Sequence, residues 1–124
     1  MSISNKAILV TGGTSGIGEG CSRHFAKCGA KVVIASNQPQ EGAALEADLR
    51  GQGIEARFFE VNVTSEDSVR ELVAKAVQTY GRIDALVSNA GVWRQGRVTD
   101  FNLDDWNAVM GVNVLGNLWL AKHV

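Results

Sequence analysis

A charge excess of either sign is missing from the 124-residue chain, which carries 12 lysines and arginines against 13 aspartates and glutamates. The net charge of -1 lacks the basic excess that usually marks a nucleic-acid or anionic-membrane partner. Long apolar runs are missing near the N-terminus, where residues 7–10 are too few for a signal segment or a membrane span. We therefore expect a cytoplasmic protein that binds neither nucleic acid nor membrane.

Cysteine and proline are also scarce, with two cysteines and one proline in the chain. Cys21 and Cys28 fall on one expected helix, where seven residues separate their Cα atoms by roughly 10 Å, beyond disulfide reach. The sequence offers no zinc-ligand spacing around them. We expect two buried free thiols and no metal site.

The chain is rich in glycine, with 14 residues, and 45% of it is apolar. This composition is that of an ordinary globular protein, and 124 residues suffice for one domain but not for two. Abundant glycine without proline favours tight turns and close backbone approaches over a collagen-like or linker-like chain. We expect a single domain over residues 1–124.

Strand and helix patterns alternate along the chain. Apolar, β-branched runs predict strands, and apolar residues at helical spacing, clearest from Val69 to Tyr80, predict helices. The expected strands lie at 7–11, 31–35, within 54–63 and at 83–88, and the expected helices at 17–28, 39–51, 65–80 and 103–124. This alternation predicts an open parallel α/β sheet with right-handed crossovers.

Capping residues mark the ends of the expected helices. Gly29 and Gly81 are placed to end helices in the left-handed conformation. Asn37, Thr64 and Asn102 stand where a side chain caps the first turn of the next helix.

The last expected helix has an unusual composition. No charged residue lies between Asp105 and Lys122, so the helix lacks a polar stripe. A helix that is apolar nearly all round is buried on more than one side. We expect it to pack against its own sheet and against something else, either further chain or another subunit.

A glycine-rich loop, Thr11–Gly18, joins the first strand to the first helix. Gly12 permits a sharp exit from the strand, Gly16 lets the backbone approach a pyrophosphate, and Gly18 lets the helix pack closely. The helix N-terminus then offers free N–H groups to phosphates. The alternative is a tight turn that binds nothing, which the strand–loop–helix context disfavours.

With these motifs the sequence resembles the short-chain dehydrogenases/reductases over nearly its whole length. The resemblance rests on Thr11–Gly18, Asn62–Val63, Asn89–Gly91 and Asn113, in order and at family spacing. It implies a Rossmann-like α/β fold, here with four strands in the order 3-2-1-4 and flanking helices, that binds NAD(P). The implied cofactor-binding residues are Gly12, Thr14, Ser15, Gly16, Ile17, Gly18, Ser36, Asn37, Asn62, Val63, Asn89, Ala90 and Gly91.

The resemblance also implies individual roles. The position of Asn62 usually holds an aspartate that contacts the adenine, and an asparagine can still form hydrogen bonds there. Residues 89–91 would stabilise the sheet beside the cofactor. Asn113 would support a proton-relay water and the catalytic lysine, although without the motif context we would favour a paired core amide at this position.

The family's catalytic serine and Tyr-x-x-x-Lys motif are absent from this sequence. Its single tyrosine, Tyr80, is followed four residues later by Asp84 and falls on the apolar stripe of its helix. We therefore expect the NAD(P)-binding half of an oxidoreductase, a truncated domain that transfers no hydride by itself. The alternative is a short non-catalytic module that binds nucleotide or self-associates.

Cofactor choice and partners follow from the same resemblance. An acidic residue after the second strand favours NAD, whereas Ser36 and Asn37 are uncharged, and Ser15 stands where NADP-preferring relatives often carry a base. We therefore favour NADP. Trp93 could face a substrate or pack internally. We expect a homo-oligomer formed through the last helix, the exposed edge of the fourth strand, or both.

Overall fold

A computed structural model describes residues 2–124, and its centre is a four-stranded parallel sheet. The strand order is β3-β2-β1-β4, which confirms the predicted fold class and topology. The strands are β1 (Ala7–Thr11), β2 (Lys31–Ser36), β3 (Ala56–Glu60) and β4 (Ala85–Ser88).

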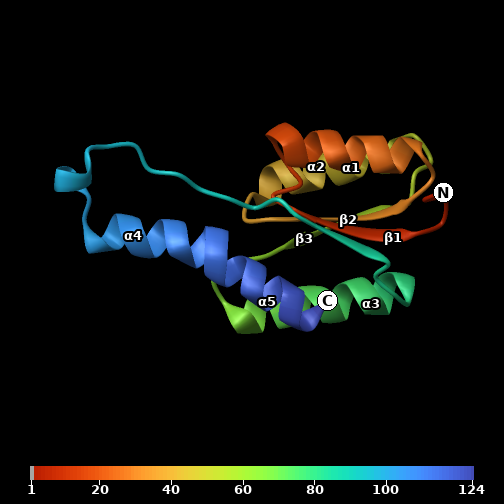
Figure 1. The fold of residues 1–124 in the computed structure, drawn as a ribbon. Helices are drawn as coiled ribbons and strands as arrows, with labels where there is room; N and C mark the ends of the chain where they lie inside the picture. Colours follow the sequence, from red (N-terminus) through yellow and green to blue (C-terminus); the bar gives the residue numbers. More distant parts are fainter. Residues whose placement is uncertain (1) are drawn as a thin grey trace.

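Helices cover both faces of the sheet, as expected for parallel strands. Figure 1 shows α1 (Gly16–Lys27) and α2 (Pro39–Gly51) on one face, with α3 (Glu66–Tyr80) and α5 (Gly116–His123) on the other. Each face has its own apolar cluster, because successive side chains of a strand point to opposite sides. In β1, Ile8 and Val10 join the cluster under α1 and α2, whereas Leu9 joins the one under α3 and α5.

Some of the predicted helix-capping residues lie where the sequence places them. Gly29 and Gly81 have φ angles of 84° and 80°, the left-handed conformation predicted for them. The side chain of Asn102 accepts a hydrogen bond from Asp105 N at 2.9 Å, so this predicted cap before α4 (Leu103–Met110) is confirmed.

Two predicted caps are wrong by one residue. Gln38, not Asn37, precedes α2, because Pro39 occupies its first turn. Ser65, not Thr64, caps α3, and its hydroxyl accepts from Ser68 N at 3.2 Å. Thr64 is held instead by the side chain of Asn62, to which both its N–H and its hydroxyl donate.

The two cysteines are free thiols, but they are not both buried. Cys21 is partly buried, and Cys28 is exposed because it lies at the C-terminal end of α1, where the chain turns through solvent. The expectation of a buried thiol is therefore wrong for Cys28.

The last helical segment is a bent rod in three parts. α4 is followed by a π-helical turn, η2 (Gly111–Leu115), and then by α5. A preceding loop contains the short 3-10 turn η1 (Val98–Asp100). Figure 1 shows α5 under the sheet beside α3, whereas α4 extends away from it.

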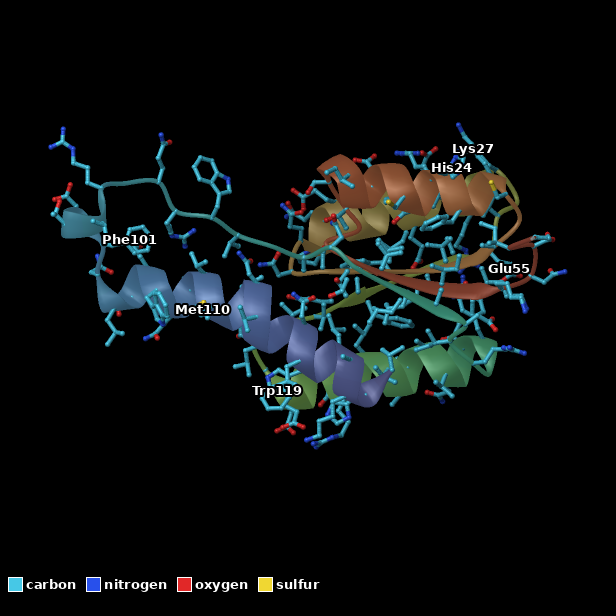
Figure 2. All side chains as sticks on the ribbon, viewed as in Figure 1. His24, Lys27, Glu55, Phe101, Met110 and Trp119 are labelled. Atoms are coloured by element: carbon cyan, nitrogen blue, oxygen red, sulfur yellow. The ribbon has the colours of Figure 1, made fainter. Side chains whose placement is uncertain are left out.

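Residues 2–124 cover only part of this rod, and its expected packing against further chain or another subunit stays a prediction. Leu120 of α5 is 1% exposed, so it belongs to the core. Apolar side chains elsewhere on the rod are more than half exposed, namely Leu103, Trp106, Val114 and Leu118. Figure 2 shows Phe101 and Met110 at α4, away from the side chains that pack against the faces of the sheet. Within residues 2–124, no helix is long and apolar enough to cross a membrane.

Asp84 fastens the edge strand β4 to β1. Its N–H donates to Ala7 O at 2.8 Å, and its carboxylate accepts from Ala7 N at 2.9 Å. The Ala7 N–H, together with Arg82 and Lys6, holds the pKa of this carboxyl below its ordinary 3.8. The ionised carboxylate thus stabilises the start of both strands.

Substituting Asp84→Asn should destabilise the fold near neutral pH and reduce its acid sensitivity. A carboxyl whose pKa is lowered in the folded state stabilises it above the unfolded pKa and loses this effect as pH falls through the folded pKa. Urea unfolding followed from neutral pH to about pH 3 should show the difference from the original protein shrinking with acid. Asp100→Asn, at an exposed loop position, is the control; a constant difference for Asp84→Asn would contradict the assignment.

Candidate functional site

A cleft of about 240 Å³ opens at the carboxyl ends of the strands, where open parallel sheets bind ligands. This volume is below the roughly 300–1,000 Å³ of typical small-molecule pockets, so the cleft can enclose part of a dinucleotide. The predicted site residues that line it are Gly12, Ser15, Ser36, Asn37, Asn62, Val63, Ala90 and Gly91. The other lining residues, Gln38, Val61, Val92 and Val112, are not among the predicted cofactor-binding residues.

The remaining predicted residues lie beside this lining. Thr14 is buried next to the lining, and the side chain of Asn89 donates a hydrogen bond to Gly12 O of the glycine loop. Ile17, in the first turn of α1, is 79% exposed. Gly16 begins α1, and Gly18 packs the helix onto the loop. The structure thus brings the predicted positions to one region, around the carboxyl ends of the four strands.

The glycine loop has the backbone that its sequence predicts. Gly12 and Gly16 have φ angles of 61° and 52°, which side chains rarely adopt. A Cβ on Gly18 would lie 2.0 Å from Gly12 O and 2.5 Å from Asn89 Nδ2. Ser15 precedes α1 without capping it through its side chain, so N–H groups of the first turn remain available to an anion.

Thr11 joins the glycine loop to the loop after β4, a role that its place in an apolar strand did not reveal. The Thr11 hydroxyl oxygen accepts from Asn89 N at 3.1 Å and from Ala90 N at 3.2 Å. Asn89 in turn donates from Nδ2 to Gly12 O at 3.2 Å. These bonds hold two walls of the cleft at a fixed separation.

Asn62 lines the cleft on the segment that follows β3. Its Oδ1 accepts from Thr64 N at 3.1 Å and from the Thr64 hydroxyl at 2.6 Å. The side-chain oxygen is therefore used within the turn, which leaves the Nδ2 donor for a ligand. An aspartate at this position could hold the turn in the same way but would lack that donor.

Asn113 lies on the π-helical turn η2 and holds the loop after β4. Its Oδ1 accepts from Val92 N at 2.8 Å, and its Nδ2 donates to Val92 O at 2.7 Å. Asn117 Nδ2 donates to the Asn113 main-chain oxygen, and the Asn117 side chain also pairs with Ser88. The side chain of Asn113 is thus a paired amide in this structure, and its support of a proton relay stays a prediction.

The cleft carries no charge in its lining, since every lining residue is uncharged. Tyr80 does not line it, and burial with the nearby Glu55 raises the pKa of its phenol to about 12. This phenol is therefore unsuited to proton transfer near neutral pH. Among residues 2–124, no group of three or more His, Cys, Asp or Glu side chains could hold a metal ion.

The 3-2-1-4 parallel sheet, with a glycine loop entering α1 beside the cleft, defines a Rossmann-like nucleotide-binding fold. Within that class the chain belongs to the short-chain dehydrogenase family, whose family model matches residues 6–124. An uncharacterized oxidoreductase of Thermotoga maritima is 38% identical over 121 residues, which are 98% of this chain and 47% of that protein.

Solved structures agree with this family. A short-chain dehydrogenase/reductase of Burkholderia phymatum in complex with NAD has a TM-score of 0.96 at 29% identity, covering 98% of this chain and 43% of that one. A blue fluorescent protein from a metagenomic library, in complex with NADPH, has a TM-score of 0.92 at 28% identity, covering 99% and 51%. The chain thus spans about half the length of these relatives.

Replacing Gly18 with alanine tests the close contact between α1 and the glycine loop. The added Cβ would meet Gly12 O and Asn89, so we expect Gly18→Ala to destabilise the protein by about 1–3 kcal/mol. Gly20→Ala is the matched control, because a Cβ there meets nothing within 4 Å and alanine favours a helix by about 0.5–1 kcal/mol. Equal unfolding midpoints in urea for both variants would refute the contact.

Proposed function

We propose that residues 1–124 form one NAD(P)-binding domain, the cofactor-binding half of a short-chain dehydrogenase/reductase. The observation that carries the proposal is the cleft between the glycine loop, the end of β2 and the loops after β3 and β4. The positive φ of Gly16 and the free first turn of α1 fit a pyrophosphate, which accepts hydrogen bonds from backbone N–H groups. Relatives solved with NAD and with NADPH support this assignment.

The proposed role of these residues is to bind and orient the dinucleotide. The bound nicotinamide ring supplies hydride transfer between the cofactor and a carbonyl or secondary alcohol. Thr11, Asn89 and Asn113 hold the loop after β4 in place, and Asn62 offers an amide donor at the β3 side. No residue of the cleft lining is an acid or base suited to move a proton at a substrate oxygen.

Binding of the dinucleotide can be tested by filling the space beside the glycine loop. We expect Gly16→Asn to keep the fold, because asparagine tolerates positive φ, and to weaken binding of NAD and NADP by placing a side chain where phosphates lie. Gly53→Asn is the control, since Gly53 has a φ of 77°, open space around it and no place in the cleft. In titration calorimetry, equal affinities for the two variants, or no binding by the original protein, would refute the site.

Catalysis by this chain alone is expected to be absent. A nicotinamide absorbance assay over a panel of ketones and alcohols should show no turnover, because the sequence contains no Tyr-x-x-x-Lys. Turnover that co-purifies with this chain, after full-length enzymes are excluded by intact-mass measurement, would contradict the expectation.

We also propose that a second copy of the chain covers α4 and η2. An open apolar groove of about 690 Å³ follows this rod, lined by Thr64, Asn107, Ala108, Met110, Gly111, Val114, Leu115 and Leu118. Exposed apolar side chains of this extent favour association. Because an isologous contact presents the same patch twice, a two-fold dimer would cover both copies at once.

A charge placed in this groove should separate the copies. We expect sedimentation velocity to show a dimer at tens of micromolar, a concentration on the order of ordinary protein affinities, and a monomer for Leu118→Glu. Val77→Glu, at an exposed apolar position on α3, should leave the dimer intact. A monomeric original protein would refute the proposed dimer, and dissociation by both variants would refute its place on the rod.

A further inference from the structure

His24 and Cys28 lie one helical turn apart at the C-terminal end of α1. Both side chains are exposed, and His24 Nε2 is 3.7 Å from Cys28 Sγ. Figure 2 shows His24 at the end of the molecule opposite α4. Neither residue lines the cleft, which lies at the other end of α1, so the pair has no part in the proposed binding of a dinucleotide.

The backbone that carries this pair is fixed. Cys28 N donates to His24 O at 3.1 Å, so the helical turn continues through Cys28. Gly29 then ends the helix with a φ of 84°, and its N–H donates to Ala26 O at 3.0 Å. The next residue, Ala30, belongs to the core. The spacing of the two side chains is therefore set by a hydrogen-bonded turn.

The separation of the two atoms fits chelation of one metal ion. Zinc binds thiolate sulfur at about 2.3 Å and imidazole nitrogen at about 2.0–2.1 Å, so tetrahedral bonds place two such donor atoms about 3.6 Å apart. The 3.7 Å between His24 Nε2 and Cys28 Sγ agrees with this value. A thiolate with an imidazole favours zinc and related transition metals over magnesium and calcium, which prefer oxygen ligands.

The surroundings of the pair allow a cation. Among residues 2–124, neither side chain has a further hydrogen-bond partner, so both donor atoms are available. Carbonyl groups at the C-terminal end of a helix carry partial negative charge, which attracts cations within the last turn. Lys27 is the one charged residue between the two in sequence, and its exposed, flexible side chain can hold its ammonium in solvent away from an ion.

We propose that His24 and Cys28 together bind a divalent transition-metal ion such as zinc, with water in its remaining positions. This assignment replaces the expectation of no metal site, which rested on the spacing of three- and four-ligand sets. Cys28 binds as the thiolate, so its proton passes to the buffer when the metal binds. The ion joins the last turn of α1 to the residue after it and stabilises the folded chain by mass action.

Titration calorimetry with zinc chloride, in a phosphine reductant that keeps the thiols reduced, tests the site. We expect one ion per chain. His24→Ala and Cys28→Ala should each weaken binding by about tenfold or more, since even the loss of a group that only orients a ligand costs about 10–100-fold. The chain offers matched controls in its other histidine and cysteine, and His123→Ala and Cys21→Ala should keep the original affinity.

Cobalt(II) in place of zinc reports the sulfur ligand directly, because a cobalt–thiolate bond absorbs in the near ultraviolet. We expect this absorption in the original protein and in Cys21→Ala, and its loss in Cys28→Ala. Thermal unfolding followed by circular dichroism shows that each variant is folded. Zinc should raise the unfolding temperature of the original protein more than that of Cys28→Ala.

Several results would overturn the proposal. They are no zinc binding by the folded original protein, or an unchanged affinity in folded His24→Ala or Cys28→Ala. Loss of the cobalt–thiolate absorption in Cys21→Ala but not in Cys28→Ala would assign the ion to the other thiol. One ion shared by two chains would refute its completion by water. Because no dinucleotide is present, these results do not depend on the proposed function.

Discussion

The approach of α1 to the end of β1 is the contact on which the site depends. Gly18 lies so close to Gly12 O that any side chain would push the helix away. This contact brings the first turn of α1 to the cleft, and the hydroxyl of Thr11 joins the same place to the loop after β4. Because several walls of the cleft meet at this point, one displacement there would move the first turn of α1 and the loop after β4 together.

The chemistry of the cleft follows from its neutrality. Its side-chain groups are hydroxyls and amides, and many of these already bond to one another, as Asn62 does with Thr64 and Gln38 with Thr14. Internal bonding fixes the direction of these groups, so the cleft presents oriented neutral groups and no charge. The π-helical turn adds to this by aiming Asn113 at the Val92 backbone, which holds the loop after β4.

The two ends of the helical rod differ in how much of their apolar surface is covered. α5 packs beside α3, where Leu120 is buried and both Lys122 and His123 reach Glu66. α4 has no such cover among the described residues and carries Trp106 and Leu103 largely exposed. The chain spans about half the length of the relatives that it matches.

The sequence by itself determined the strands, their order, the glycine loop and the family, because apolar periodicity and glycine positions are local signals that the family's motifs reinforce. Tertiary structure alone decided which residues meet across the loops. Thr11 reads as the last residue of an apolar strand, and nothing in the sequence marks Gln38. Their contacts join positions from 24 to 79 apart, and such distances leave no pattern in a single sequence.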